Sequence, residues 1–146
     1  MGERAIRPWT WKALKWAVTL AKANFAEDRG DFERAWILLD EAERMGHVRL
    51  RDRVQRARLL LRMQRIKEAN LAFLALRNEL KGSEHPDQKY LRHYCTYMLS
   101  SMSRTSSGQW GYEAEQAKLI PCSPSLKRNF PMTTIDEIYE RIPAKP

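Results

Sequence analysis

Arginine side chains are the most chemically informative feature of this 146-residue sequence. The segment RLRDRVQRARLLLRMQR, residues 49–65, holds seven arginines in seventeen positions. A guanidinium group donates two parallel hydrogen bonds to a carboxylate or a phosphate, so the segment is suited to binding acidic groups rather than to breaking bonds. Whether it meets nucleic acid, a membrane surface or an acidic protein depends on the elements that hold it.

Side chains that perform nucleophilic or metal chemistry are few and separated. His93 and Cys95 lie two positions apart, so on a helix they point about 160° away from each other and cannot form a nucleophile–base pair. Cys122 is distant from Cys95, and neither belongs to a CxxC or Cys/His cluster of the kind that binds zinc. We therefore expect a noncatalytic protein, with no metal and no cofactor, in the reducing cytoplasm.

The net charge of +8 is divided unevenly along the chain. Counting Lys, Arg, Asp and Glu gives +4 for residues 1–24, −4 for residues 25–46 and +7 for residues 47–82, with only +1 for the remainder. Such a charge distribution favours an acidic partner. No segment approaches the roughly 18 apolar residues of a membrane span, so we expect no crossing of a membrane.

Apolar residues recur at three- and four-residue steps, which predicts helices and no sheet. We expect helices at residues 10–28, 32–44, 49–63, 66–80 and 86–104. The first of these has an apolar stripe that we expect to face the core: Trp11, Leu14, Val18, Ala21 and Phe25.

The C-terminal part of the sequence predicts less regular structure. Residues 104–111 should end the fifth helix, and several prolines predict an extended chain over residues 121–131. A short helix is expected near 134–142, where Thr134 and Glu137 fit a capping box.

A shift of 34 residues aligns the first two helices with the next two. The apolar pairs that it superimposes are Ala23 with Ala57, Ala26 with Leu60, Phe32 with Ile66, Ala35 with Ala69, Leu39 with Phe73 and Ala42 with Leu76. This period, with the motif GDFERAWILLDEA, resembles the tetratricopeptide repeat family. The residues that fit the family pattern in the first unit are Ala23, Gly30, Asp31, Phe32, Ala35 and Ala42. The second unit departs from it at Gln64-Arg65 and at Leu76.

The resemblance implies an all-α fold in which antiparallel helix pairs stack as a short right-handed superhelix. Its helical domain would cover residues 1–104, with pairs at 10–46 and 49–82 and a capping helix at 86–104, followed by a proline-containing segment at 105–146. Two units are fewer than such arrays usually need, so either that segment or another chain should complete the core. Members of this family bind peptide segments in a concave groove.

At about 100° per residue, the arginines of residues 49–65 form two edges of the expected helix. One edge consists of Arg51, Arg58, Arg62 and Arg65, and the other, which we expect at the outer surface, consists of Arg49, Arg53 and Arg56. In the geometry that the resemblance implies, the first edge faces the groove, and the 34-residue shift adds one residue before it and one after it. We therefore expect an acidic peptide or protein surface to bind in a groove lined by Asn24, Arg51, Arg58, Arg62 and Arg92. Two alternatives stay open: a solvated face paired with nearby carboxylates, or RNA or DNA phosphates contacted also by Arg49, Arg53 and Arg56.

A second apolar face on the first expected helix consists of Trp9, Trp16 and Leu20, rimmed by lysines. It is interpreted either as a homodimer or partner contact or as the place where the C-terminal segment packs. In the first case the chain would be an obligate subunit of a homo- or hetero-oligomer.

Overall fold

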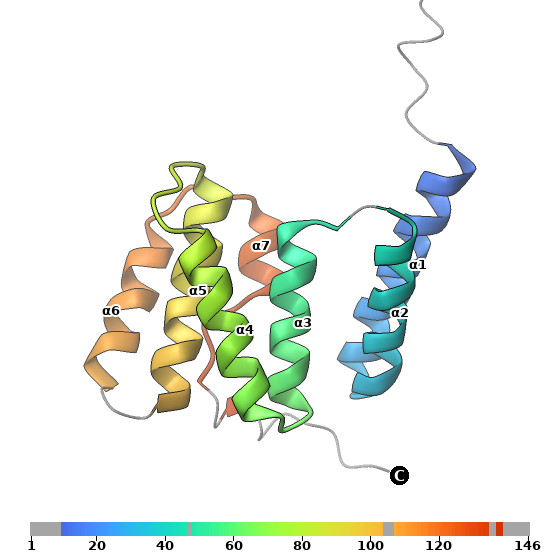
Figure 1. The fold of residues 1–146 in the computed structure, drawn as a ribbon. Helices are drawn as coiled ribbons and strands as arrows, with labels where there is room; N and C mark the ends of the chain where they lie inside the picture. The colour runs from blue at the N-terminus through green and yellow to red at the C-terminus, as the bar shows by residue number, and fades with distance from the viewer. Residues whose placement is uncertain (1–9, 47, 104–106, 135–136, 139–146) are drawn as a thin grey trace, which may run out of the picture. The chain divides into compact units, whose positions relative to one another are not determined.

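The computed structural model describes residues 10–46, 48–103, 107–134 and 137–138, and the side chains of all of these except 107–110. Within these ranges the chain is helical and contains no strand, which confirms the all-α prediction (Figure 1). None of the helices described there combines the length and apolarity that a membrane span requires. The helices are α1 (Trp11–Asp28), α2 (Phe32–Arg44), α3 (Leu50–Arg62), α4 (Ile66–Glu79), α5 (Pro86–Ser103), α6 (Ser107–Lys118) and α7 (Pro124–Asn129).

The chain forms two compact units, residues 1–59 and residues 60–146. The first contains α1, α2 and the larger part of α3, and the second contains the end of α3 and helices α4 to α7. The boundary therefore lies inside a continuous helix, whereas the sequence pattern predicts one near residue 104.

In the first unit, α1 and α2 pack as an antiparallel pair whose N-termini are set by side-chain caps. Thr10 Oγ1 accepts a hydrogen bond from the backbone N–H of Ala13 at 3.0 Å, and Asp31 Oδ1 accepts one from Arg34 at 3.3 Å. Between the helices Gly30 has a φ of 82°, a left-handed conformation that glycine adopts without steric cost. The chain can therefore reverse within a few residues.

The turn between α3 and α4 repeats this geometry 34 residues later. Gln64 takes the position of Gly30 and has a φ of 65°. The next residues also agree, with φ and ψ of −89° and 74° at Asp31 and of −92° and 69° at Arg65. Each of these two donates its N–H to a carbonyl five residues earlier at 2.9 Å, as in a Schellman turn: Asp31 to Ala26, and Arg65 to Leu60.

Burial follows the same period. Nine of the aligned residues are at most 3% exposed: Ala23 and Ala57, Ala35 and Ala69, Leu39 and Phe73, Ala42 and Leu76, and Ala26. Leu60, which is aligned with Ala26, is 7% exposed. Alanine at the first two positions keeps side chains short where helices pack closely. The aligned pair of Phe32 and Ile66 is the exception, because Ile66 is 43% exposed.

The face that α1 buries is not the predicted one. Leu20, Ala23 and Ala26 are buried, whereas most of the expected core stripe lies at the surface. The exposed fractions are 77% for Trp11, 45% for Leu14, 45% for Val18 and 62% for Phe25. The prediction is wrong because α1 is apolar on two faces, and periodicity alone does not show which of them meets the rest of the chain.

In the second unit α5 packs against both α4 and α6 (Figure 1). Tyr94 is only 1% exposed, and its ring meets that of Phe73 edge-on at 6.2 Å and that of Phe130 at 5.3 Å between centroids. Tyr90 Oη donates a hydrogen bond to the carbonyl oxygen of Phe130 at 2.6 Å. The chain after α6 thus contributes to this core, and α5 is an interior helix of the unit rather than its end.

Two C-terminal segments differ from the sequence predictions. Residues 107–111 are part of α6 and residues 124–129 form α7, where irregular and extended chain were expected. Pro124 fits the first position of α7, because a proline there loses no hydrogen bond that the helix would make. The capping box is confirmed, since the N–H of Glu137 donates to Thr134 Oγ1 at 3.2 Å. Most of the helix expected near 134–142 lies outside the described residues.

Candidate partner-binding site

A buried polar network joins α1 to α3 within the first unit. Glu27 accepts hydrogen bonds from Arg58 Nε at 2.8 Å and Nη2 at 3.1 Å, and from Gln55 Nε2 at 2.8 Å. The same Gln55 nitrogen also donates to Asn24 Oδ1 at 2.7 Å. Glu27 and Arg58 are only 3% and 8% exposed, so each charged group contacts the other and polar neighbours instead of water.

This network includes two of the predicted groove residues. Asn24 and Arg58 are linked through Gln55 and Glu27. The guanidinium of Arg58 lies in the interior of the unit, paired with Glu27. Arg51 is half-buried in the same unit, on α3. Arg62 and Arg92 are half-buried residues of the second unit. Binding of a partner by Asn24, Arg51, Arg58, Arg62 and Arg92 together stays a prediction.

Glu27 and Gln55, the partners of Asn24 and Arg58, are not among the residues predicted from the sequence. A signal for Glu27 is present, because the 34-residue shift places it on Leu61, which is completely buried. A carboxylate at a position that the other repeat uses for its apolar core indicates a buried ion pair. The cation for such a pair should come from a neighbouring helix, as Arg58 does here.

The other arginine edge of α3 also packs against neighbouring helices. Arg56 Nη2 lies 2.8 Å from Asp40 Oδ1 and Nη1 lies 3.2 Å from Glu43 Oε2, both on α2. Its Cζ lies 4.2 Å from the centroid of the Trp36 ring, a cation–π contact. The side chain is 19% exposed, so it belongs to the helix contact more than to the outer surface where the sequence analysis places it.

Arg49 has a similar role beside α1. Its Nη2 lies 2.9 Å from Asp52 Oδ1, and its Cζ lies 5.1 Å from the centroid of the Trp16 ring. Trp16 is half-buried and Leu20 is 7% exposed, so this second face of α1 already lies against the folded chain. Trp9 lies outside the described residues.

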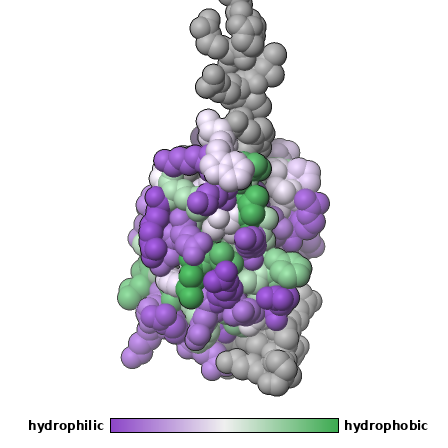
Figure 2. Space-filling view, turned by 90° about the vertical axis from the view of Figure 1, so that its right-hand side faces the viewer, coloured by the Kyte–Doolittle hydropathy of each residue, from purple (hydrophilic) through white to green (hydrophobic). Residues whose placement is uncertain are grey.

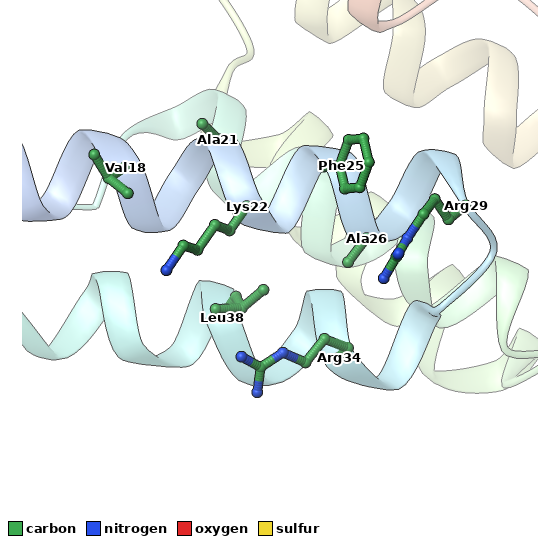
Figure 3. A pocket seen from close by; sticks show the side chains of 8 residues that line it. All are labelled: Val18, Ala21, Lys22, Phe25, Ala26, Arg29, Arg34 and Leu38. Carbon is green, nitrogen blue, oxygen red and sulfur yellow. The ribbon is translucent and has the colours of Figure 1, made fainter.

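An open groove of about 430 Å³ runs between α1 and α2. Its apolar lining consists of Val18, Ala21, Phe25, Ala26 and Leu38. Figure 3 shows Lys22 and Arg29 extending from α1 toward α2, which contributes Arg34 to the same groove. The groove therefore offers an apolar surface with a cationic rim.

The three cations of the rim are exposed. Among the residues that the structure describes, no carboxylate forms an ion pair with Lys22, Arg29 or Arg34. Arg29 Cζ lies 5.0 Å from the centroid of the Phe25 ring, so its guanidinium rests on apolar surface. Three such cations around one groove can donate charge-assisted hydrogen bonds to acidic groups.

The groove is not predicted from the sequence, because the apolar stripe of residues 10–28 is expected to face the core and includes Val18 and Phe25. A signal was present in α1, which has more apolar residues than one buried face can hold. The space-filling view of Figure 2, turned toward the side where Figure 1 draws α1 and α2, shows hydrophobic side chains gathered between hydrophilic ones. The surplus apolar face of α1 is therefore the face with Trp11, Val18 and Phe25, and not the one with Leu20.

Two titratable side chains of α5, those of His93 and Cys95, lie in helix contacts of the second unit. His93 Nδ1 contacts the carboxylate of Glu113 and so joins α5 to α6. Burial raises the pKa of the Cys95 thiol to about 12, which keeps the sulfur protonated and a poor nucleophile. In the part of the chain that the structure describes, no three His, Cys, Asp or Glu side chains gather as metal ligands would.

No protein-family model, curated protein or solved structure matches the chain. Its own features therefore define its class: it is an all-helical protein with an open apolar groove rimmed by cations.

Proposed function

We propose that this chain is a noncatalytic interaction module of tetratricopeptide-like helical repeats that binds an acidic segment of a partner protein. The observation that carries the proposal is the groove between α1 and α2, where Lys22, Arg29 and Arg34 rim apolar side chains. The apolar surface supplies binding energy when it is covered, and the cations select a partner with carboxylates. Because Arg58 is engaged by Glu27, this groove suits the role better than a surface centred on Arg58.

Two observations support the repeat interpretation. The left-handed turns at Gly30 and Gln64 have the same hydrogen-bond pattern, 34 residues apart. The buried positions of α1 and α2 recur at the same distance in α3 and α4. We extend the family's right-handed stacking of helix pairs to this chain as part of the proposal.

Charge reversal in the groove tests the proposed function. The groove variant carries Lys22→Glu, Arg29→Glu and Arg34→Glu, and the control variant carries Lys67→Glu, Lys81→Glu and Arg128→Glu. All six side chains are exposed, and both variants change the net charge equally. The probe is a flexible fluorescent peptide in which Asp and Glu are interspersed with Leu and Gly. We expect the groove variant to bind it at least about tenfold more weakly than the wild type, and the control variant to bind like the wild type.

Fluorescence polarisation at low and high salt measures these affinities, and a single-stranded oligonucleotide serves as a second probe. Equal loss of peptide binding in both variants would mean that net charge, and not the groove, attracts the peptide. Tight oligonucleotide binding with a steep salt dependence, weakened equally in both variants, would replace the proposal with nucleic-acid binding.

A further inference from the structure

The exposed apolar residues of α1 follow a heptad pattern. If Trp11 is assigned to position a, then Val18 and Phe25 also occupy position a, and Leu14 and Ala21 occupy position d. All five are exposed. A seam of a and d residues is typical of a helix that packs lengthwise along another helix, so this face is suited to a helical partner.

The positions beside this seam carry charge on one flank only. Lys15, Lys22 and Arg29 occupy three successive e positions. Lys22 and Arg29 also rim the groove, so this flank of the seam borders it. Arg34 of α2 adds a fourth cation to that groove. The opposite flank is uncharged, with g positions occupied by Thr10, Ala17 and Asn24. Since e and g residues determine partner choice in paired helices, the basic flank specifies the partner's charge.

A second copy of this chain does not complement the seam. In an antiparallel self-pairing the e residues face each other, which would bring Lys15, Lys22 and Arg29 against the same cations of the other copy. In a parallel self-pairing the e residues would face the uncharged g residues and gain no attraction. Charge complementarity therefore selects a different helix, one with carboxylates beside its apolar residues.

We propose that the occupant of this face is an acidic amphipathic helix of another protein, packed along α1 with apolar residues at its own a and d positions and Asp or Glu flanking them. This inference rests on the proposed function and specifies the form of the acidic segment. At about 1.5 Å per residue, the seam from Trp11 to Phe25 is about 21 Å long. About two heptads of a partner helix cover that length.

Two fluorescent peptides of identical composition test the helical form of the partner. The heptad peptide has about three heptads with Leu at a and d and Glu at e and g, and the scrambled peptide has the same residues without the heptad spacing. We expect the heptad peptide to bind at least about tenfold more tightly and to gain helical circular dichroism on binding.

Substitutions along the seam locate the site. Val18→Glu should weaken binding of the heptad peptide at least about tenfold. Leu71→Glu is the matched control, because Leu71 is an apolar residue of α4 that is 68% exposed, and binding should be unchanged. A variant with Lys15→Glu, Lys22→Glu and Arg29→Glu should instead prefer a heptad peptide with Lys in place of Glu, since the charge rule is reciprocal.

Three results would overturn the inference. Equal affinity for the heptad and scrambled peptides would contradict the proposal that the partner segment is helical. It would leave the proposed function intact, because that function is tested by the groove variant with the flexible probe. Unchanged binding of the heptad peptide by Val18→Glu would place the site elsewhere. In sedimentation, a wild-type dimer that dissociates in Val18→Glu would identify a second copy as the occupant.

Discussion

At the scale of single residues, Glu27 and Arg58 hold opposite charges in a part of the first unit that water scarcely reaches. Removing one partner leaves the other charge buried and uncompensated. We expect Arg58→Ala to lower the free energy of unfolding by about 3 to 5 kcal/mol, and Glu27→Ala to have a similar effect. Urea denaturation followed by circular dichroism measures both.

A double variant provides the control for this prediction. Glu27→Leu with Arg58→Met removes both charges while keeping apolar volume, and it should regain most of the lost stability. If the losses of Glu27→Leu and Arg58→Met, each measured alone, simply add in the double variant, the two charges are not coupled. The pair also makes Arg58→Glu a poor test of partner binding, because it would set a second carboxylate against Glu27 and unfold the unit.

The two cysteines should differ sharply in reactivity. Cys95 is fully buried and its pKa is raised by burial to about 12, whereas Cys122 is half-buried and its pKa is raised less strongly, again chiefly by burial. Because the thiolate is the reactive form, iodoacetamide at about pH 8 should modify Cys122 in the native protein and leave Cys95 intact.

Mass spectrometry of the alkylated protein measures this difference, and the same reaction in urea, where both thiols should react, is its control. Raising the pH toward 9 should speed the reaction of Cys122 only, since the thiolate fraction of a thiol increases with pH while burial still protects Cys95. Modification of native Cys95 at the rate of Cys122 would contradict its burial.

At the scale of elements, the turn after α3 has a residue in an unfavourable backbone conformation. Gln64 has a φ of 65°, which crowds its Cβ, whereas glycine lacks that atom. We expect Gln64→Gly to raise the free energy of unfolding by about 1 kcal/mol. Ala75→Gly at an exposed site inside α4 should lower it by about 1 kcal/mol. Thermal and urea unfolding compare the two, and a similar loss in both variants would mean that the turn gains nothing from glycine.

The helices differ in how far local sequence predicts them. Periodicity places the first five within one residue of their ends, because each has a regular apolar stripe. It does not predict the start of α6, where serine and glycine weaken the helical signal and packing on α5, including the contact of Glu113 with His93, favours the helix. In α1 the helix was predictable but its buried face was not, because both faces are apolar.

At the scale of the whole molecule, the uneven charge of the sequence predicts a basic surface. It does not predict which cations are available to bind a partner. Arg56 meets Asp40 and Glu43 only because α2 lies beside α3 in the first unit. Those carboxylates are more than ten positions away in sequence, so no local pattern pairs them with Arg56. Lys22, Arg29 and Arg34 were less conspicuous in the sequence, yet they rim the groove.

The matched turns at Gly30 and Gln64 have a consequence for finding other chains that contain the same pair of turns. The torsion angles of the turn are preserved between the two repeats although the residue at its centre differs. An alignment scored on amino-acid identity loses the repeat at this point, whereas one scored on backbone torsion keeps it in register. Other chains with this pair of turns should therefore be sought by the spacing of their left-handed residues rather than by a Gly-Asp motif.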